Sequence, residues 1–232
     1  MTDLHSHVLP KIDDGASSVD ESLALLSMLR EQGVKTVAAT PHLYFRNMTV
    51  SSFLEKRAAS YAALAERLSE ITSPRVILGA EVEYFQGISR MSELLDLRIE
   101  GSELLLIEMP CERWSEYTVR EITELSSMSG IVPMIAHVER CIDYQPVRVL
   151  NKLIDSNIIM QANASFFAEL KTRRKALKFL KKGIIQAVAS DCHNLRHRPP
   201  RLSEAVEVIS HKFGAEFVSD MTRFADGLVG IE

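Results

Sequence analysis

The chain has 232 residues, of which 46% are hydrophobic and 25% charged, and its formal net charge is −4. This composition is typical of a globular protein with a substantial buried core. The slightly acidic balance excludes the basic footprint of a nucleic-acid-binding protein. No apolar run reaches the ~18 residues of a membrane-spanning helix, so we expect no membrane insertion.

The number and spacing of the cysteines indicate the redox state of the compartment. Cys111, Cys141 and Cys192 are odd in number and form no C-x-x-C pair. This pattern disfavours a disulfide framework and favours a reducing cytoplasm. The first residues have neither a basic nor an apolar segment, so we expect no targeting signal and a cytoplasmic protein.

Seven apolar runs, many of them β-branched, predict strands that are covered on both faces. The first is a short run around Leu4, and the others span residues 34–39, 75–80, 104–107, 131–136, 158–161 and 184–189. Helical patterns fill the gaps: residues 18–33, a segment through 61–71, and residues 115–128, 146–156, 169–182 and 202–213. In the first helix, Ser18 and Glu21 have the spacing of a capping box, and Gly33 marks the end.

This alternation predicts an α/β fold with a parallel sheet. A closed or nearly closed (β/α) barrel is the favoured form, and an open doubly wound sheet is the alternative. No linker, repeat or low-complexity stretch divides the chain. We therefore expect one domain over residues 1–232.

Polar side chains follow the strands. The runs are followed in turn by His5, His7, Asp13 and Asp14; His42; Glu81 and Glu83; Glu108; His137, Glu139 and Arg140; Asn163; and Ser190, Asp191 and His193. The C-terminal strand ends of a barrel converge on one mouth, so five of the seven histidines would meet several carboxylates there. Such a cluster would repel itself or stay unsatisfied unless divalent cations bound to it.

The spacing within two segments supports a metal site. His5 and His7 alternate along a strand and so share a face; Asp191 and His193 do the same, with Cys192 pointing away. The absence of a thiolate cluster favours Mn, Fe, Zn or Mg. A lone His42 or Glu108 would more often be an ordinary hydrogen-bonded residue, so the prediction depends on the whole set.

Seven ordered segments carry a family resemblance. They are D-L-H-S-H-V-L-P-K-I-D-D-G (3–15), T-P-H (40–42), G-A-E (79–81), I-E-M (107–109), A-H-V-E-R (136–140), S-D-C-H-N (190–194) and R-P-P (198–200). Together they resemble the polymerase-and-histidinol-phosphatase (PHP) superfamily. Within it they are most similar to the CpsB/CapC-type tyrosine phosphatases of bacterial capsule and exopolysaccharide operons.

The resemblance implies a distorted (β/α)7 TIM-like barrel, the PHP fold, with three divalent metal ions, commonly manganese, at the C-terminal strand ends. The implied ligands are His5, His7, Glu81 and Asp191 for one metal; Glu81, Glu108 and His137 for a second; and Asp14, His42 and His193 for a third. Arg140 and Arg198 would bind phosphate. The implied activity is metal-dependent hydrolysis of phosphotyrosine. The implied partner is a phosphotyrosyl protein, in particular the tyrosine-rich tail of a bacterial tyrosine kinase that controls polysaccharide synthesis.

Alternative functions stay open. A PHP phosphatase of a small metabolite such as histidinol phosphate would use the same chemistry in a different pocket. A nuclease or proofreading module lacks support from the charge balance, and a non-catalytic relative would have lost ligands that are all present here. A cysteine mechanism would use the C-x5-R spacing of Cys192 and Arg198, but the intervening loop has no glycine to cradle phosphate.

Several residues have two interpretations. Asp13 or Glu139 would either donate a proton or, as the favoured interpretation, support a histidine. Five aromatic residues would either line an entrance for a phosphotyrosine ring or pack against the barrel rim: Tyr44, Phe45, Tyr84, Phe85 and Trp114. The seven Lys and Arg between residues 171 and 182 predict a solvated helix face, with docking of an acidic partner as the alternative.

Overall fold

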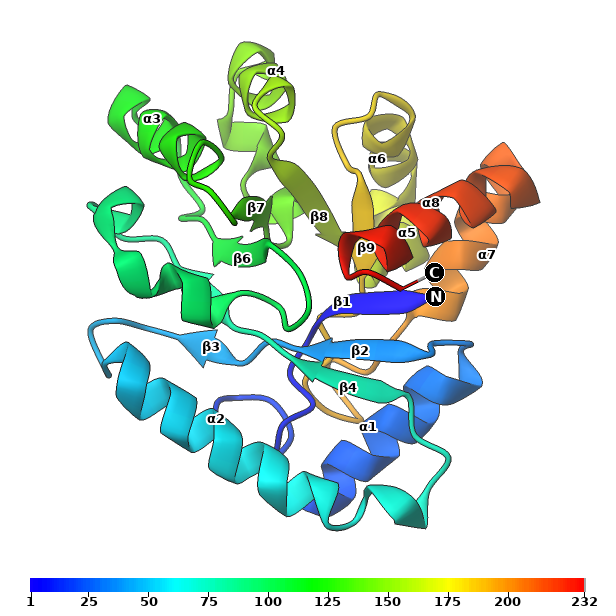
Figure 1. Cartoon of the computed structure of the whole chain (residues 1–232). Helices are drawn as coiled ribbons and strands as arrows, with labels where there is room; N and C mark the ends of the chain where they lie inside the picture. Colours follow the sequence, from blue (N-terminus) through cyan, green and yellow to red (C-terminus); the bar gives the residue numbers. More distant parts are fainter. Residues whose placement is uncertain (232) are drawn as a thin grey trace.

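The computed structural model describes residues 1–231, with β-strands at the centre and helices outside them (Figure 1). All seven predicted strand regions form strands. The bounds are β1 Thr2–Ser6, β2 Thr36–Ala39, β3 His42–Leu43, β4 Arg75–Leu78, β5 Glu81–Glu83, β6 Leu104–Glu108, β7 Val132–Ile135, β8 Ile159–Asn163 and β9 Ala187–Ala189. The second and third regions form β2 and β4, and each is followed by a further short strand that the pattern did not predict, β3 and β5. Pro41 lacks the N–H that would continue the ladder of β2.

The strands pair in parallel in the order of a barrel. One sheet has the order β1-β2-β4 and the other β3-β5-β6-β7-β8-β9. A bridge between Ser6 and Cys192 brings the segment after β9 back to β1. There the N–H of Asp191 donates to the His5 carbonyl at 2.8 Å, and the N–H of His7 donates to the Cys192 carbonyl at 2.9 Å. These bonds favour the distorted (β/α)7 barrel over an open doubly wound sheet.

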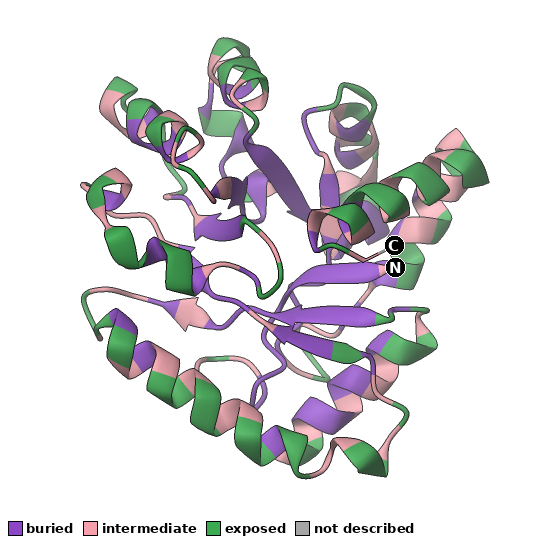
Figure 2. Cartoon of the chain, in the orientation of Figure 1, coloured by how far each residue is buried: buried purple, intermediate pink, exposed green. Residues whose placement is uncertain are grey.

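The helices cover the strands from outside, with exposed residues on their outer faces (Figure 2). Their bounds are α1 Val19–Glu31, α2 Val50–Ala65, α3 Glu116–Leu125, α4 Val147–Asp155, α5 Ala164–Ala168, α6 Leu170–Lys181, α7 Leu202–Phe213 and α8 Ala215–Leu228. Ser18 caps α1 as predicted, because its Oγ accepts the Glu21 N–H at 3.1 Å. Glu21 reaches back to the N–H of Ser17, one residue before the position that a capping box uses.

The sequence pattern did not predict α5 or α8. Helix α8 lies against the N-terminal end of the barrel, where Thr2 donates to Asp226 at 2.6 Å. Ala225 and Val229 join a buried apolar cluster with inward-facing strand residues such as Leu4 and Leu106. One end of the barrel is therefore apolar and plugged, which leaves the other end for polar chemistry. No helix within residues 1–231 is long and apolar enough to cross a bilayer.

Candidate metal centre

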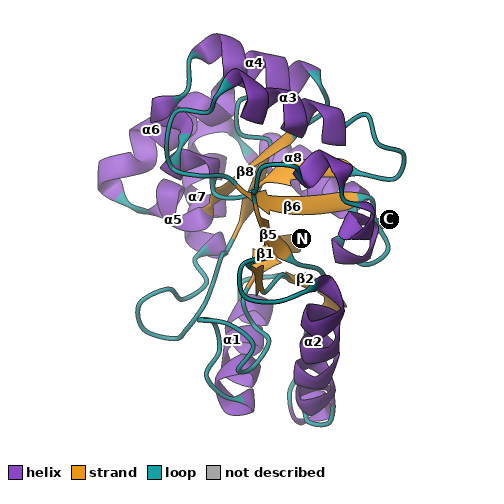
Figure 3. Cartoon of the chain, turned by 90° about the vertical axis from the view of Figure 1, so that its left-hand side faces the viewer, coloured by secondary structure: helices purple, strands orange, loops and turns teal. Residues whose placement is uncertain are grey.

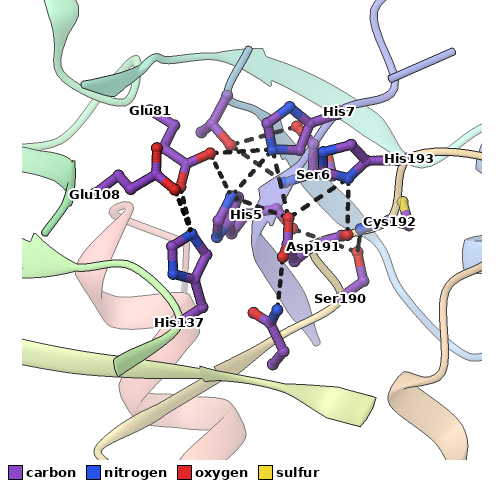
Figure 4. Close-up of polar contacts among 12 residues, drawn as sticks. His5, Ser6, His7, Glu81, Glu108, His137, Ser190, Asp191, Cys192 and His193 are labelled. Atoms are coloured by element: carbon purple, nitrogen blue, oxygen red, sulfur yellow. Dashed lines mark hydrogen bonds and ion pairs between the residues drawn. The ribbon is translucent and has the colours of Figure 1, made fainter. Parts of the chain in front are cut away.

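All nine side chains that the sequence marks as metal ligands lie at the C-terminal end of the barrel (Figure 4 shows seven of them with labels). They come from seven segments: His5 and His7 at the end of β1, Asp14 in the following loop, His42 in β3, Glu81 in β5, Glu108 in β6, His137 after β7, and Asp191 and His193 after β9. All are buried or half-buried except Asp14, which is exposed.

The most compact group joins His5, His7, Glu81 and Asp191. The Nε2 atoms of His5 and His7 are 3.2 Å apart, and each is 3.2 Å from Glu81 Oε2 and 3.4 Å from Asp191 Oδ1. Ligand atoms with metal bonds of about 2.0–2.2 Å stand about 2.8–3.6 Å apart along the edges of a tetrahedron or octahedron. His5, His7 and Glu81 therefore offer donor atoms within 4.8 Å of one another, close enough to share one cation, and Asp191 Oδ1 lies within ligand spacing of both histidine nitrogens.

A second group forms on the other oxygen of Glu81. His137 Nε2 lies 2.8 Å from Glu81 Oε1 and 3.6 Å from Glu108 Oε1. His42 Nδ1 approaches the same carboxylates, at 3.0 Å from Glu81 Oε2 and 3.9 Å from Glu108 Oε2. The carboxylate of Glu81 thus lies between two groups and has the geometry of a bridging ligand.

A third group surrounds Asp14. Its Oδ1 lies 3.5 Å from the Nε2 atoms of both His42 and His193. His7 joins this group, because one nitrogen or oxygen from each of the four residues lies within 4.8 Å of the others. His7 and His42 therefore each lie between two groups.

The unpaired polar atoms of the cluster provide a test of fit for bound cations. Among the side chains of residues 1–231, four buried nitrogen or oxygen atoms have no hydrogen-bond partner: His42 Nδ1, Glu81 Oε2, Asp191 Oδ1 and His193 Nε2. All four belong to this cluster. A buried polar atom without a partner costs about 1–3 kcal/mol, and cation binding would satisfy all four. The residues present therefore fit divalent metal ions.

Two buried carboxylates of the cluster, Glu81 and Asp191, are in the form that binds metal. Burial opposes ionisation of Glu81, but the neighbouring imidazoles, His5 above all, outweigh it and hold its pKa well below the usual range. Asp191 behaves in the same way. Burial raises its pKa, but His5 and His7 outweigh this effect and hold the pKa well below the usual range. Both groups are therefore ionised near neutral pH.

Asp13 orients His7. Its Oδ2 lies 2.7 Å from His7 Nδ1 and accepts the backbone N–H of His42 at 3.0 Å. Burial raises the pKa of Asp13, but the hydrogen bond and charge of His7, together with the N–H groups of His42 and Gly15, outweigh it and lower the pKa to about 2. This contact leaves Nε2 of His7 free to bind a cation. The geometry agrees with the favoured interpretation of Asp13 as support for a histidine.

Glu139 makes a different contact. Its carboxylate accepts the backbone N–H of Asn163 at 3.3 Å, and burial raises its pKa to about 7. The expected hydrogen bond to a histidine is not among the contacts of residues 1–231. Glu139 therefore differs from Asp13 in holding a proton close to neutral pH.

Two residues of β8, neither of them predicted as a ligand, connect the proposed ligands through hydrogen bonds. Gln161 Oε1 accepts the His137 N–H at 2.8 Å and lies 3.1 Å from His5 Nδ1. Its amide group donates to Asn163 Oδ1, and Asn163 in turn donates to Asp191 Oδ2 at 2.6 Å. A buried glutamine inside an apolar strand was the available signal for this role.

The two predicted phosphate-binding arginines border the cluster. The guanidinium groups of Arg140 and Arg198 lie 3.0 Å and 2.5 Å from Asp191 Oδ2, and their side chains are 38% and 35% exposed. The loop before Arg198 is organised by Asn194, whose Oδ1 accepts the N–H groups of Arg196, His197 and Arg198. Both guanidinium groups can thus reach solvent while one N–H contacts the cluster.

Cys192 is buried, and its sulfur points away from the cluster, as predicted (Figure 4). Burial raises the pKa of its thiol far above neutrality. A thiol of this kind stays protonated and is a poor nucleophile. The geometry therefore argues against the cysteine mechanism.

The five aromatic residues near the predicted strand ends divide between lining an entrance to the site and packing against the barrel rim. Tyr44 stacks on the ring of His42, with centroids 5.0 Å apart, and so lies at the cluster. Phe45 and Phe85 pack against each other. Tyr84 donates to Glu121, and Trp114 is buried with its indole N–H bonded to the Pro110 carbonyl, so these two are packing residues.

Comparison with known proteins identifies relatives over nearly the whole chain. The family model described as "Capsular polysaccharide synthesis, CpsB/CapC" matches residues 1–226. The tyrosine-protein phosphatase CpsB of Streptococcus pneumoniae is 33% identical over 95% of this chain and 94% of its own length. The tyrosine-protein phosphatase YwqE of Bacillus subtilis is 28% identical over 99% of this chain and 91% of its own length.

Solved structures give the same relationship. A chain from the crystal structures of YwqE from B. subtilis and CpsB from S. pneumoniae, described as metal-dependent tyrosine phosphatases, superposes with a TM-score of 0.84 at 25% identity, covering 99% of this chain and 94% of that one. Histidinol phosphate phosphatase from Lactococcus lactis, solved with zinc, L-histidinol and phosphate, superposes with a TM-score of 0.55 at 13% identity, covering 91% of this chain and 92% of that one. The second similarity extends to the fold alone.

Proposed function

The chain belongs to the CpsB/CapC family, and on this basis we propose that it is a metal-dependent protein-tyrosine phosphatase of capsule or exopolysaccharide synthesis. The observation that carries the proposal is the set of four unpaired buried donor atoms, all in a cluster whose donor spacing suits cations. The named relatives supply the reaction, phosphotyrosine hydrolysis.

We assign three cations to the cluster, with manganese as the first choice and Fe, Zn or Mg as alternatives. The assignment is His5, His7, Glu81 and Asp191 for one; Glu81, Glu108 and His137 for the second; and Asp14, His42 and His193 for the third. Glu81 would serve both of the first two cations, because its two oxygens face different groups. Oxygen and imidazole ligands without thiolate suit all of these metals.

Bound divalent cations would supply positive charge for the phosphoryl oxygens and lower the pKa of a water to about 7. The side chains contribute the rest of the chemistry. Arg140 and Arg198 each keep N–H groups beyond their contact with Asp191, and these can bind phosphate oxygens in a fork. Their charge would stabilise the transferring phosphoryl group.

The leaving group fits the site as well. Tyrosine has a pKa of ~10, so a phenolate leaves with less acid assistance than an alkoxide does. Tyr44, stacked on His42, is placed to pack against an incoming aromatic ring.

The physiological context extends the proposal. We propose a phosphotyrosyl protein as substrate, with the tyrosine-rich tail of a bacterial tyrosine kinase as the candidate. We also propose that residues 1–232 act as one PHP domain in the cytoplasm. The free cysteines are compatible with that location.

A chelation experiment tests the activity. Purified protein, loaded with Mn²⁺, is assayed on a phosphotyrosyl peptide and, in parallel, on histidinol phosphate. We expect release of phosphate from the peptide at least ~10²-fold faster in kcat/KM, loss of that activity after treatment with a strong chelator, and its return when Mn²⁺ is added back.

The matched control is Cys192→Ser, which removes the buried thiol without touching a proposed ligand. We expect this variant to keep most of the activity, because the thiol faces away from the cluster. Activity that survives chelation but disappears in Cys192→Ser would assign the chemistry to the thiol. Preference for histidinol phosphate would replace the tyrosine phosphatase with the metabolite phosphatase.

A further inference from the structure

A groove of about 660 Å³ lies between the N-terminal halves of α3 and α4. The two helices are side by side in both views of the molecule (Figures 1 and 3). None of the ten side chains that line the groove is a proposed metal ligand or phosphate-binding arginine. The groove is therefore a feature separate from the metal cluster.

Two loops that carry residues of the metal cluster also contribute residues to the groove. The loop after β6 begins at Glu108 and reaches Arg113 five residues later, so the two Cα atoms are at most ~18 Å apart. The loop after β7 carries His137 and Arg140 and ends at Pro146, which lines the groove. Strand ends and helix starts share one face of a (β/α) barrel, so the groove opens on the same rim as the cluster.

A buried glutamine joins the two loops. Gln145 accepts the Trp114 N–H at 3.1 Å and donates to the carbonyl of Glu112 at 2.6 Å. Its amide also lies 3.3 Å from the Cys141 carbonyl. The groove floor is thus held by hydrogen bonds in a fixed position relative to both loops.

The charge of the groove is opposite to that of the chain. Its lining includes four cations, Arg113, Arg120, Arg148 and Lys152, and one carboxylate, Glu116, in a chain whose net charge is −4. Among the ion pairs of residues 1–231, Arg120 pairs with Glu124 at 3.8 Å, whereas the other three cations have no carboxylate within 4.0 Å. Three positive charges are therefore available to an acidic ligand.

Apolar side chains accompany the charge, although Trp114 and Val119 are largely buried in the groove wall. Trp114, Val119 and Val149 line the groove. Within two residues along the chain of the lining residue Pro146, Tyr144 and Val147 are 53% and 61% exposed, among the most exposed large hydrophobic side chains of the described residues. A mixture of aromatic and cationic residues is typical of surfaces that bind peptides.

We propose that this groove binds an acidic, extended segment of the phosphotyrosyl substrate, within about five residues of the phosphotyrosine. The proposal rests on the proposed phosphatase function and adds a determinant of substrate choice. The upper limit on the distance sets the register, because an extended chain needs no more than about five residues to cover the at most ~18 Å between Glu108 and Arg113. The complementary charge sets the composition.

The kinetic test compares matched peptides. One phosphotyrosyl peptide carries three glutamates three to five residues before the phosphotyrosine, and a second carries them three to five residues after it. Each peptide has a partner in which glutamine replaces the glutamates. We expect the Mn²⁺-loaded protein to prefer one glutamate peptide by ~5–10-fold in kcat/KM, mainly through KM, and less so at high salt. The double variant Arg113→Gln, Arg148→Gln should lose this preference and hydrolyse p-nitrophenyl phosphate like the unmodified chain.

The control variant is Lys171→Gln, Arg174→Gln, which removes two exposed charges from α6. It should keep the preference, because the basic face of α6 is a different surface. Equal rates on glutamate and glutamine peptides, or a preference that survives in the groove variant, would overturn the proposal.

A binding measurement separates this proposal from the phosphatase itself. Trp114 is the one tryptophan of the chain and lines the groove, so its fluorescence should respond to an acidic peptide that carries a non-hydrolysable phosphonate in place of phosphate. If no phosphotyrosyl peptide is hydrolysed but this response depends on Arg113 and Arg148, the phosphatase proposal fails and the groove proposal stands. If the groove variant loses binding to phosphatidylserine vesicles instead, with peptide binding unchanged, the groove serves a membrane surface and the proposal is overturned.

Discussion

Gly15 shows how one position without a side chain sets the geometry of a proposed ligand. A Cβ atom at this position would lie 2.3 Å from the carbonyl oxygen of His7 and 2.6 Å from its Cβ. The N–H of Gly15 donates to Asp13 Oδ1, and the other oxygen of Asp13 contacts His7 Nδ1. The glycine of the D-D-G segment is therefore needed for close approach, and it fixes the ring of His7 through Asp13.

We predict that Gly15→Ala lowers Mn²⁺ affinity by ~10-fold or more, because the added methyl group must displace His7 or Asp13. Isothermal titration of the metal-free protein measures this change. Gly227→Ala is the control: Gly227 lies in α8, nothing would lie within 4 Å of its new Cβ, and alanine favours a helix by about 1 kcal/mol. Unchanged Mn²⁺ affinity in Gly15→Ala would show that the loop relaxes freely.

Strand β8 contributes no proposed ligand, yet it holds three of them in place. Gln161 contacts His5 and His137, and Asn163 contacts Asp191. His137 and Asp191 have φ angles of 31° and 50°, a left-handed region that non-glycine residues rarely adopt. Hydrogen bonds from neighbouring strands stabilise these two strained positions.

Replacing Gln161 by leucine should affect both stability and metal binding. The N–H of His137 would lose its partner in a buried site, which costs about 1–3 kcal/mol of unfolding free energy. The ring of His5 would lose its orientation, and Mn²⁺ affinity should fall by ~10–100-fold. Denaturant unfolding and metal titration measure the two effects.

Gln186→Leu is the control for that experiment. Gln186 Oε1 accepts the Met160 N–H at 2.8 Å, a similar bond between neighbouring segments that has no contact with the cluster. This variant should lose stability and keep its Mn²⁺ affinity. An equal loss of affinity in both variants would mean that β8 acts through general destabilisation.

The elements that the sequence predicted are those with a strong local signal. Doubly covered strands give continuous apolar runs, and strand ends converge, so the strands and the clustered ligands follow from the pattern. Helix α8 was missed because its apolar positions lie beyond the last predicted strand and Gly214 interrupts the pattern before it. Gln161 is a visible polar residue in an apolar run, but its contacts do not follow from the sequence, because one partner, His5, is 156 residues away.

The barrel as a whole has two unlike ends. At the N-terminal end, α8 closes an apolar interior, in which Leu4, Leu106 and Met134 are buried. At the other end, the proposed ligands come from six strands or the loops that follow them, and four of their buried donor atoms lack partners. Bound cations would therefore connect strands around the whole circumference, where the metal-free protein has repulsion and unsatisfied groups.

Metal loading should consequently stabilise the entire molecule. At a free Mn²⁺ concentration of 100 times Kd, one site adds about 2.7 kcal/mol. A chain of this length gains about 2–4 °C in Tm per kcal/mol, so we expect Tm to rise by at least ~5 °C in differential scanning calorimetry. The gain should shrink as the pH falls, because imidazoles bind metal only when deprotonated. Burial lowers the pKa of His5 and His7, but the neighbouring carboxylates outweigh it and raise both above the usual histidine value, so the loss should begin above that value. Glu81→Gln, which alters the proposed bridging carboxylate, should abolish most of it, and an equal Tm increase in that variant would place the stabilising cations elsewhere.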